Sequence, residues 1–78
     1  MVGFRYFVEE RARARGLAGW VRNGADGASV EVVAEGEDDR LRELDAALRD
    51  GPRGARVERV ESDWDEAVEG LAGFSVRF

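Results

Sequence analysis

Arginine, carboxylate, amide and hydroxyl groups are the side chains available for chemistry in this 78-residue chain. The sequence contains no cysteine and no histidine, and all twelve of its basic residues are arginines. Thiolate nucleophiles, thiolate and imidazole metal ligands, histidyl phosphoryl acceptors and Schiff-base lysines are therefore excluded. Any catalysis must use the four groups that remain.

Arg5 and Asn23 are the candidates for such chemistry. Arg5 lies near the start of a predicted helix, where a planar guanidinium and unpaired helix N–H groups can together hold a phosphate. Asn23 has an amide that can orient a water molecule through its carbonyl oxygen and its NH₂ group. Taken alone, each residue has a simpler interpretation, because most arginines are solvated surface charges and asparagine before glycine is common in hairpin turns.

The element that carries Arg5 is predicted to be a helix from about Arg5 to Arg15. Apolar residues recur there with the period of one helix face: Phe4, Phe7, Val8 and Ala12. Gly16 follows and suits the left-handed conformation that ends many helices.

A β-hairpin is predicted next, and Asn23 lies at the end of its first arm. The first arm covers residues 17–23, Gly24 to Gly27 supply the turn, and the second arm covers residues 29–35. Apolar residues occupy alternate positions of the second arm: Val30, Val32 and Ala34. The sequence therefore predicts a sheet that is covered on one face.

The second half of the chain predicts another helix and two further strands. Asp38 or Asp39 is expected to cap the helix, and Gly51 with Pro52 to end it. Its core stripe consists of Leu41, Leu44 and Leu48. An irregular strand is expected within 56–64, and a terminal strand with an inward apolar face formed by Phe74, Val76 and Phe78. This order predicts an α+β sandwich with two helices on one face of a mainly antiparallel sheet.

Length and charge limit the remaining possibilities. A chain of this size forms a single domain, 1–78. Seventeen acidic residues against twelve arginines give a net charge of −5, which disfavours nucleic acid as a partner. No apolar run approaches the ~18 residues that a membrane span needs, so no membrane partner is predicted and the chain is expected in the cytoplasm.

Two separated motifs carry a resemblance to a known family. The first is Val2-Gly3-Phe4-Arg5-Tyr6-Phe7, and the second is Gly19-Trp20-Val21-Arg22-Asn23, followed by Gly27 and the strand at 30–36. With these motifs the chain resembles an acylphosphatase over Val2 to Phe78. The resemblance implies a ferredoxin-like β-α-β-β-α-β fold with a further short strand. It also implies hydrolysis of a small-molecule acyl phosphate to a carboxylate and inorganic phosphate, with no metal and no cofactor.

The resemblance also implies the roles of individual residues. The family's catalytic arginine matches Arg5 and is expected to bind the phosphate, and its asparagine matches Asn23 and is expected to orient the attacking water. The segment that surrounds the phosphate corresponds to Val2, Gly3, Phe4 and Arg5. Trp20 and Trp64 are interpreted as packing residues and are assigned to no site.

The chain departs from the family pattern in two places. The family's first strand and glycine-containing loop have no counterpart before Val2, so we expect exposed sheet edges and self-association through the vacant edge. A late start site, a truncation, or a strand supplied by another protomer would each explain this. The alternative function is then an impaired ferredoxin-like remnant that binds a phosphate ligand or a protein through its open edge. Ala28 and Ser29 also make the hairpin turn one residue longer, with little expected effect on Asn23.

Overall fold

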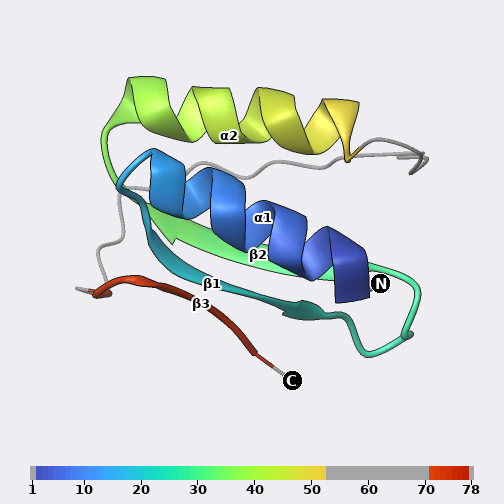
Figure 1. The fold of residues 1–78 in the computed structure, drawn as a ribbon. Coiled ribbons are helices and arrows are strands. Elements are labelled where there is room, and N and C mark those ends of the chain that lie inside the picture. Colours follow the sequence, from blue (N-terminus) through green and yellow to red (C-terminus); the bar gives the residue numbers. More distant parts are fainter. Residues whose placement is uncertain (1, 53–70, 78) are drawn as a thin grey trace.

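Two helices cover one face of a three-stranded sheet in the part of the chain that the structure describes (Figure 1). The structure is a computed structural model that describes residues 2–52 and 71–77. The elements are α1 (Val2–Ala14), β1 (Ala18–Asn23), β2 (Val30–Glu35), α2 (Asp38–Asp50) and β3 (Phe74–Val76). The predicted α+β sandwich is confirmed. The strand expected within 56–64, and Phe78, lie outside the described residues.

The strand order in the described sheet is β2-β1-β3. The hairpin makes β1 and β2 antiparallel, with Asn23 opposite Val30. β3 comes from a segment about fifty residues further along and pairs with β1 in parallel, with Val21 opposite Val76. The described sheet is therefore mixed, and the longer of its two pairings, that of β1 with β2, is antiparallel as the sequence predicted.

The core lies between the helices and the sheet, and each described element contributes to it. Its buried residues are Val8, Ala12, Leu17, Val21, Leu44 and Phe74. Leu41 and Leu48 pack against this cluster, as do the alternate residues of β2 that the sequence predicted to face inward. Burying one large aliphatic or aromatic side chain contributes roughly 1.5–3 kcal/mol, so this cluster stabilises the packing of the helices on the sheet.

Two predicted helix boundaries are corrected. α1 begins at Val2, three residues before the predicted start, since the helical backbone continues beyond the apolar stripe. The N-cap of α2 is Glu37, with no side-chain capping hydrogen bond, so the prediction of Asp38 or Asp39 as the cap is wrong. Both aspartates lie in the first turn, where their charge complements the helix dipole.

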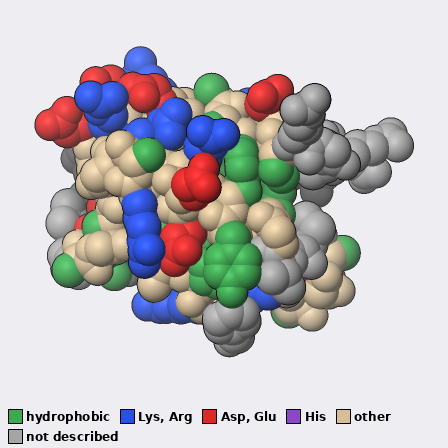
Figure 2. Space-filling view, in the orientation of Figure 1, with side chains coloured by type: hydrophobic (Ala, Val, Ile, Leu, Met, Phe, Trp, Pro, Cys, Tyr) green, Lys and Arg blue, Asp and Glu red, His purple; other side chains and the backbone are tan. Residues whose placement is uncertain are grey.

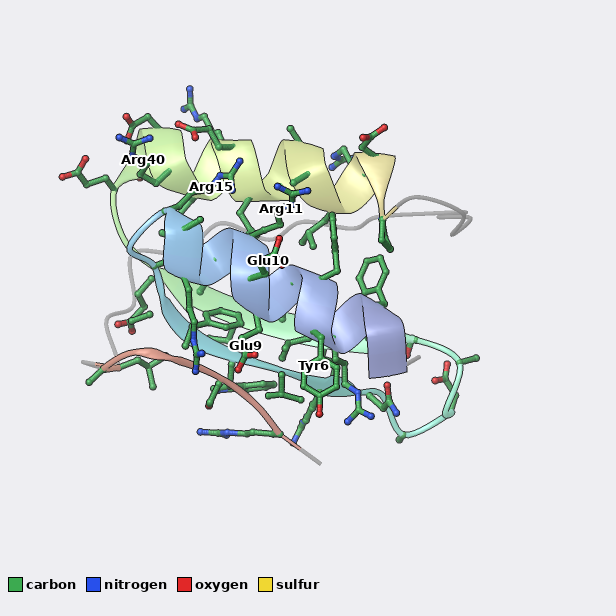
Figure 3. All side chains as sticks on the ribbon, viewed as in Figure 1. Tyr6, Glu9, Glu10, Arg11, Arg15 and Arg40 are labelled. Atoms are coloured by element: carbon green, nitrogen blue, oxygen red, sulfur yellow. The ribbon has the colours of Figure 1, made fainter. Side chains whose placement is uncertain are left out.

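Charged side chains tie the two helices together at one end. Glu43 of α2 pairs with Arg15, which follows α1, at 3.4 Å and with Arg40 at 3.2 Å. Figure 3 labels the two arginines at this end of the helices. All three side chains reach solvent, so each pair contributes less than about 1 kcal/mol. Figure 2 shows arginine and acidic side chains interspersed over this face rather than separated by sign. Among the described residues, no helix is long and apolar enough to cross a membrane.

Asp26 organises the hairpin turn that follows Asn23. Its Oδ1 accepts hydrogen bonds from the backbone N–H of Ala28, the backbone N–H of Ser29 and the Ser29 hydroxyl, at 2.8–2.9 Å. The backbone N–H of Ser29, followed by that of Ala28, holds the pKa of Asp26 below its usual value because these donors favour the charged carboxylate. The hairpin turn thus has its own hydrogen-bond network.

The lowered pKa of Asp26 predicts a pH dependence of stability. A depressed native pKa stabilises the fold above the unfolded pKa of about 4, and this contribution is lost as the pH falls through the native value. Asp26→Asn keeps an acceptor oxygen but removes the titration, so its unfolding free energy is expected to fall less between about pH 6 and about pH 3. Urea unfolding at the two pH values measures this. An unchanged pH dependence in the variant would contradict the assignment.

Candidate active site

Arg5 and Asn23 lie at the same end of the sandwich. α1 runs antiparallel to β1, and a short turn joins Ala14 to Ala18. Arg5 lies nine residues before Ala14, or about 14 Å along the helix, and Asn23 lies five residues after Ala18, or about 17 Å along the strand. The N-terminus of α1 therefore lies over the hairpin end of β1, as Figure 1 shows.

Strand parity directs Asn23 toward the helices. Gly19 and Val21 are buried on the helix-covered face of β1, and Asn23 is the next residue of the same parity. Its side chain is half-buried, and its Oδ1 atom is fully buried with no protein hydrogen-bond partner in the described ranges. An unsatisfied buried acceptor costs about 1–3 kcal/mol, so this carbonyl oxygen calls for a functional explanation.

Among the described residues, Arg5 is the one charged residue that is buried. It is only 4% exposed, although it lies in the second turn of a surface helix. Its Nη1 donates a hydrogen bond of 3.2 Å to the main-chain oxygen of Arg77, just after β3. The planar guanidinium presents a fork of donors that fits phosphate oxygens, so a buried arginine at this position is suited to holding a negative ligand.

The first turn of α1 adds backbone donors beside Arg5. The first N–H groups of a helix have no partner within it, and this turn contains no acidic side chain that would compete with an anion. A Cβ atom built on Gly3 would meet nothing within 4 Å, so the backbone is open there. Phe4 packs against the core and against Phe7, with ring centroids 5.9 Å apart, and so fixes the turn on the sheet.

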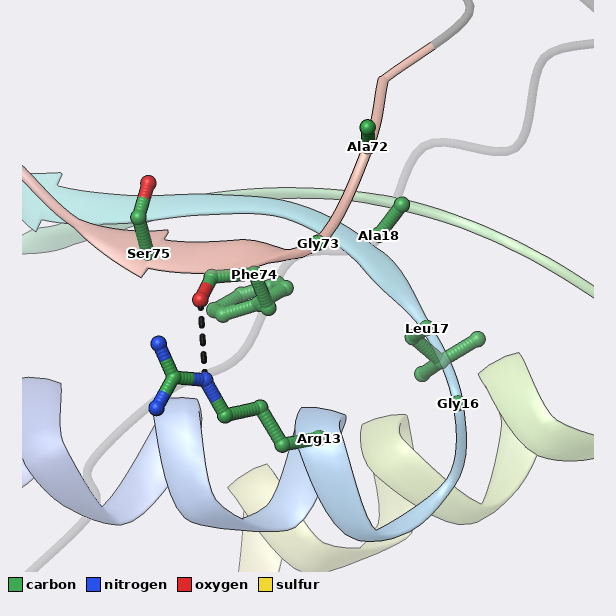
Figure 4. A pocket seen from close by; sticks show the side chains of 8 residues that line it. All are labelled: Arg13, Gly16, Leu17, Ala18, Ala72, Gly73, Phe74 and Ser75. Atoms are coloured by element: carbon green, nitrogen blue, oxygen red, sulfur yellow. Dashed lines mark hydrogen bonds between the residues drawn. The ribbon is translucent and has the colours of Figure 1, made fainter.

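A hollow lies near the other end of α1 (Figure 4). Its lining residues are Arg13, Gly16, Leu17, Ala18, Ala72, Gly73, Phe74 and Ser75. Arg13 is engaged there, since its Nε donates to the Phe74 oxygen at 3.0 Å and its Nη2 pairs with Glu9 at 3.3 Å. This arginine braces α1 against β3 and lies far from Asn23. Among the residues described, no group of three potential metal ligands occurs.

The sequence does not predict Arg77 as a neighbour of Arg5. The two residues are 72 positions apart, and the contact uses a main-chain oxygen. No residue type in the sequence signals such a contact. Only the parallel register of β3 with β1 could have indicated it.

A buried arginine under an open helix N-terminus, with a buried amide oxygen at the same end, is an arrangement suited to an anion such as phosphate. The family model described as Acylphosphatase matches residues 1–76. The chain therefore belongs to the acylphosphatase family. This confirms the resemblance and the implied enzyme class, hydrolysis of an acyl phosphate.

Relatives and solved structures agree with this assignment. The acylphosphatase of Salinibacter ruber is 51% identical over 76 residues, covering 97% of this chain and 79% of the relative. That of Caldivirga maquilingensis is 49% identical, covering 99% of this chain and 81% of the relative. A crystal structure of acylphosphatase from Bacillus subtilis is similar with a TM-score of 0.91 at 39% identity, over 99% of this chain and 84% of that one. The ferredoxin-like fold is thereby confirmed.

Proposed function

We propose that Arg5, the first turn of α1 and Asn23 form the catalytic site at which this chain hydrolyses acyl phosphates. The substrate phosphate lies on the N–H groups of Val2, Gly3 and Phe4 and against the Arg5 guanidinium. A charge-assisted hydrogen bond is worth roughly 1.5–3 kcal/mol, so a few of them outweigh the repulsion from a net charge of −5.

Asn23 positions the attacking water in this proposal. Oδ1 accepts a hydrogen bond from the water, which directs a lone pair at phosphorus in line with the leaving carboxylate. The new bond joins the water oxygen to phosphorus, the bond between phosphorus and the acyl oxygen breaks, and the carboxylate departs with the electron pair. The water proton passes to a phosphate oxygen. No general base is needed, because a carboxylate is a good leaving group.

The buried Oδ1 of Asn23, without a protein partner in the described ranges, is the observation that carries the proposal. Its location at the same end as the Arg5 guanidinium supports a shared ligand. The direct test is hydrolysis of benzoyl phosphate by the chain, with inorganic phosphate as a competitive inhibitor. Turnover that phosphate does not inhibit would contradict a site built around a phosphate.

Gly3→Ala separates phosphate binding from folding. Because the Cβ meets no protein atom and alanine favours helix by about 0.5–1 kcal/mol, the melting temperature is expected to rise by a few degrees. The same Cβ crowds a ligand held on the first-turn N–H groups, so the inhibition constant of phosphate is expected to increase several-fold. Thermal unfolding and inhibition assays measure the two effects. A stabilised variant with unchanged phosphate affinity would place the ligand elsewhere.

We also propose that the chain self-associates through a sheet edge. β2 is an edge strand of the described sheet, and edge strands offer unpaired backbone groups to other chains. Sedimentation velocity over a range of concentrations is expected to show a species larger than a monomer. A compact monomer throughout would contradict this.

The alternative function is an impaired binding module rather than an enzyme. Phosphate binding without turnover would favour it. The proposed location is the cytoplasm, which cell fractionation tests.

A further inference from the structure

We propose that Trp20 and Arg77 are positioning residues for Arg5, and that a cation–π contact on the outer face of the sheet sets the geometry of the phosphate-binding guanidinium on the inner side. The inference rests on the proposed function, since it assumes that Arg5 binds the phosphate. The sequence predicts only a packing role for Trp20.

Arg77 makes three contacts that fix its peptide and side chain. Its backbone N–H donates to the Val21 oxygen at 2.8 Å, which continues the pairing of β3 with β1. Its carbonyl oxygen accepts the 3.2 Å hydrogen bond from Arg5 Nη1. Its guanidinium carbon lies 4.7 Å from the centre of the Trp20 ring. The acceptor that receives Arg5 is therefore held by a sheet hydrogen bond and by a side-chain contact.

The contact with Trp20 lies on the side of the sheet away from the helices. Gly19 and Val21 are buried beneath the helices, so Trp20 between them faces outward. β3 has only three residues and lies at the edge of the described sheet, where few ladder bonds hold it. A cation–π contact just beyond such a strand restrains the peptide that follows it. Because the main-chain oxygen of Arg77 accepts a hydrogen bond from Arg5, restraining this peptide also restricts the rotamers of the long Arg5 side chain.

Arg22 provides a matched comparison. Its guanidinium carbon lies 4.9 Å from the centre of the same Trp20 ring. Its Nε and Nη2 also donate to Glu31 Oε2 at 3.1 and 3.0 Å. Two arginines thus share one aromatic partner, and it is the peptide of Arg77 that accepts a hydrogen bond from Arg5. Substituting either arginine removes a cation–π contact with Trp20. Only substitution of Arg77 is expected to alter the geometry of Arg5.

The experiment measures the KM for benzoyl phosphate, kcat, and the inhibition constant of inorganic phosphate in five variants. Arg77→Ala and Trp20→Leu are expected to raise KM and the inhibition constant by about three- to tenfold, with a smaller change in kcat. Arg77→Lys and Trp20→Phe keep a cation and a ring face, so they are expected to restore most of the affinity. Arg22→Ala is expected to leave all three parameters near the wild-type values. Circular dichroism confirms that each variant is folded.

A double variant provides the decisive comparison. If Trp20 acts through Arg77, the combined Trp20→Leu and Arg77→Ala variant is expected to bind phosphate about as well as either single variant. Independent, additive effects would overturn the inference, as would equal effects of Arg22→Ala and Arg77→Ala. Arg5→Ala separates the two levels. If it binds phosphate like the wild type, the proposed function fails. If it loses binding while Arg77→Ala and Trp20→Leu do not, only this inference fails.

Discussion

In Arg5→Ala, kcat/KM for benzoyl phosphate is expected to fall about 10²–10⁴-fold. In the proposed site, the substitution removes two charge-assisted hydrogen bonds to the phosphate, each worth roughly 1.5–3 kcal/mol, and about 1.4 kcal/mol corresponds to a factor of ten. Steady-state kinetics measure the loss. Arg5→Lys keeps the charge but not the planar fork, so its activity is expected to lie between those of the wild type and the alanine variant.

Arg13→Ala is the control for the structural part of the Arg5 substitution. Like Arg5, Arg13 lies on α1 and donates to a main-chain oxygen in the β3 segment, that of Phe74 at 3.0 Å. It lies near the other end of the helix, beside the hollow in Figure 4. Its loss is expected to lower the melting temperature slightly and to leave kcat/KM unchanged. Equal kinetic losses in both variants would mean that Arg5 acts only by holding α1 to the sheet.

In Asn23→Ala, kcat is expected to fall about 10²–10³-fold while the inhibition constant of phosphate changes little. The amide is proposed to hold the water rather than the phosphate, and loss of one preorganised group in an active site typically costs this much. The structural cost is small, because the substitution removes a buried carbonyl oxygen that has no protein partner in the described ranges. Kinetic assays and phosphate titration of the same preparation separate the two effects.

Asn23→Asp tests how the amide works. A carboxylate keeps an acceptor oxygen but adds a negative charge next to the phosphate, so both kcat and phosphate affinity are expected to fall. If the residue served as a general base instead, the aspartate variant would gain activity as the pH rises through the pKa of its carboxyl group. A gain of that kind would rule out the water-positioning role.

Much of the local structure was predictable from the sequence. The spacing of Phe4, Val8 and Ala12 predicts one buried helix face, and α1 buries the last two residues fully. Gly16 and Gly51 have positive φ values of 67° and 76° after the two helices, where a side chain would be strained. The cap of α2 was predicted incorrectly because two aspartates and a glutamate stand together, and each could occupy that position.

The sequence by itself determined the helices, the hairpin and the motif residues Arg5 and Asn23, because periodicity, turn chemistry and motifs are properties of neighbouring residues. Only the tertiary structure decided that Arg5 is 4% exposed, that the Arg77 oxygen receives it, and that Arg77 lies against Trp20. These contacts join segments more than fifty residues apart through the parallel register of β3 with β1. That register depends on which arrangement buries Val21 and Phe74 together, and burial is a property of the whole chain.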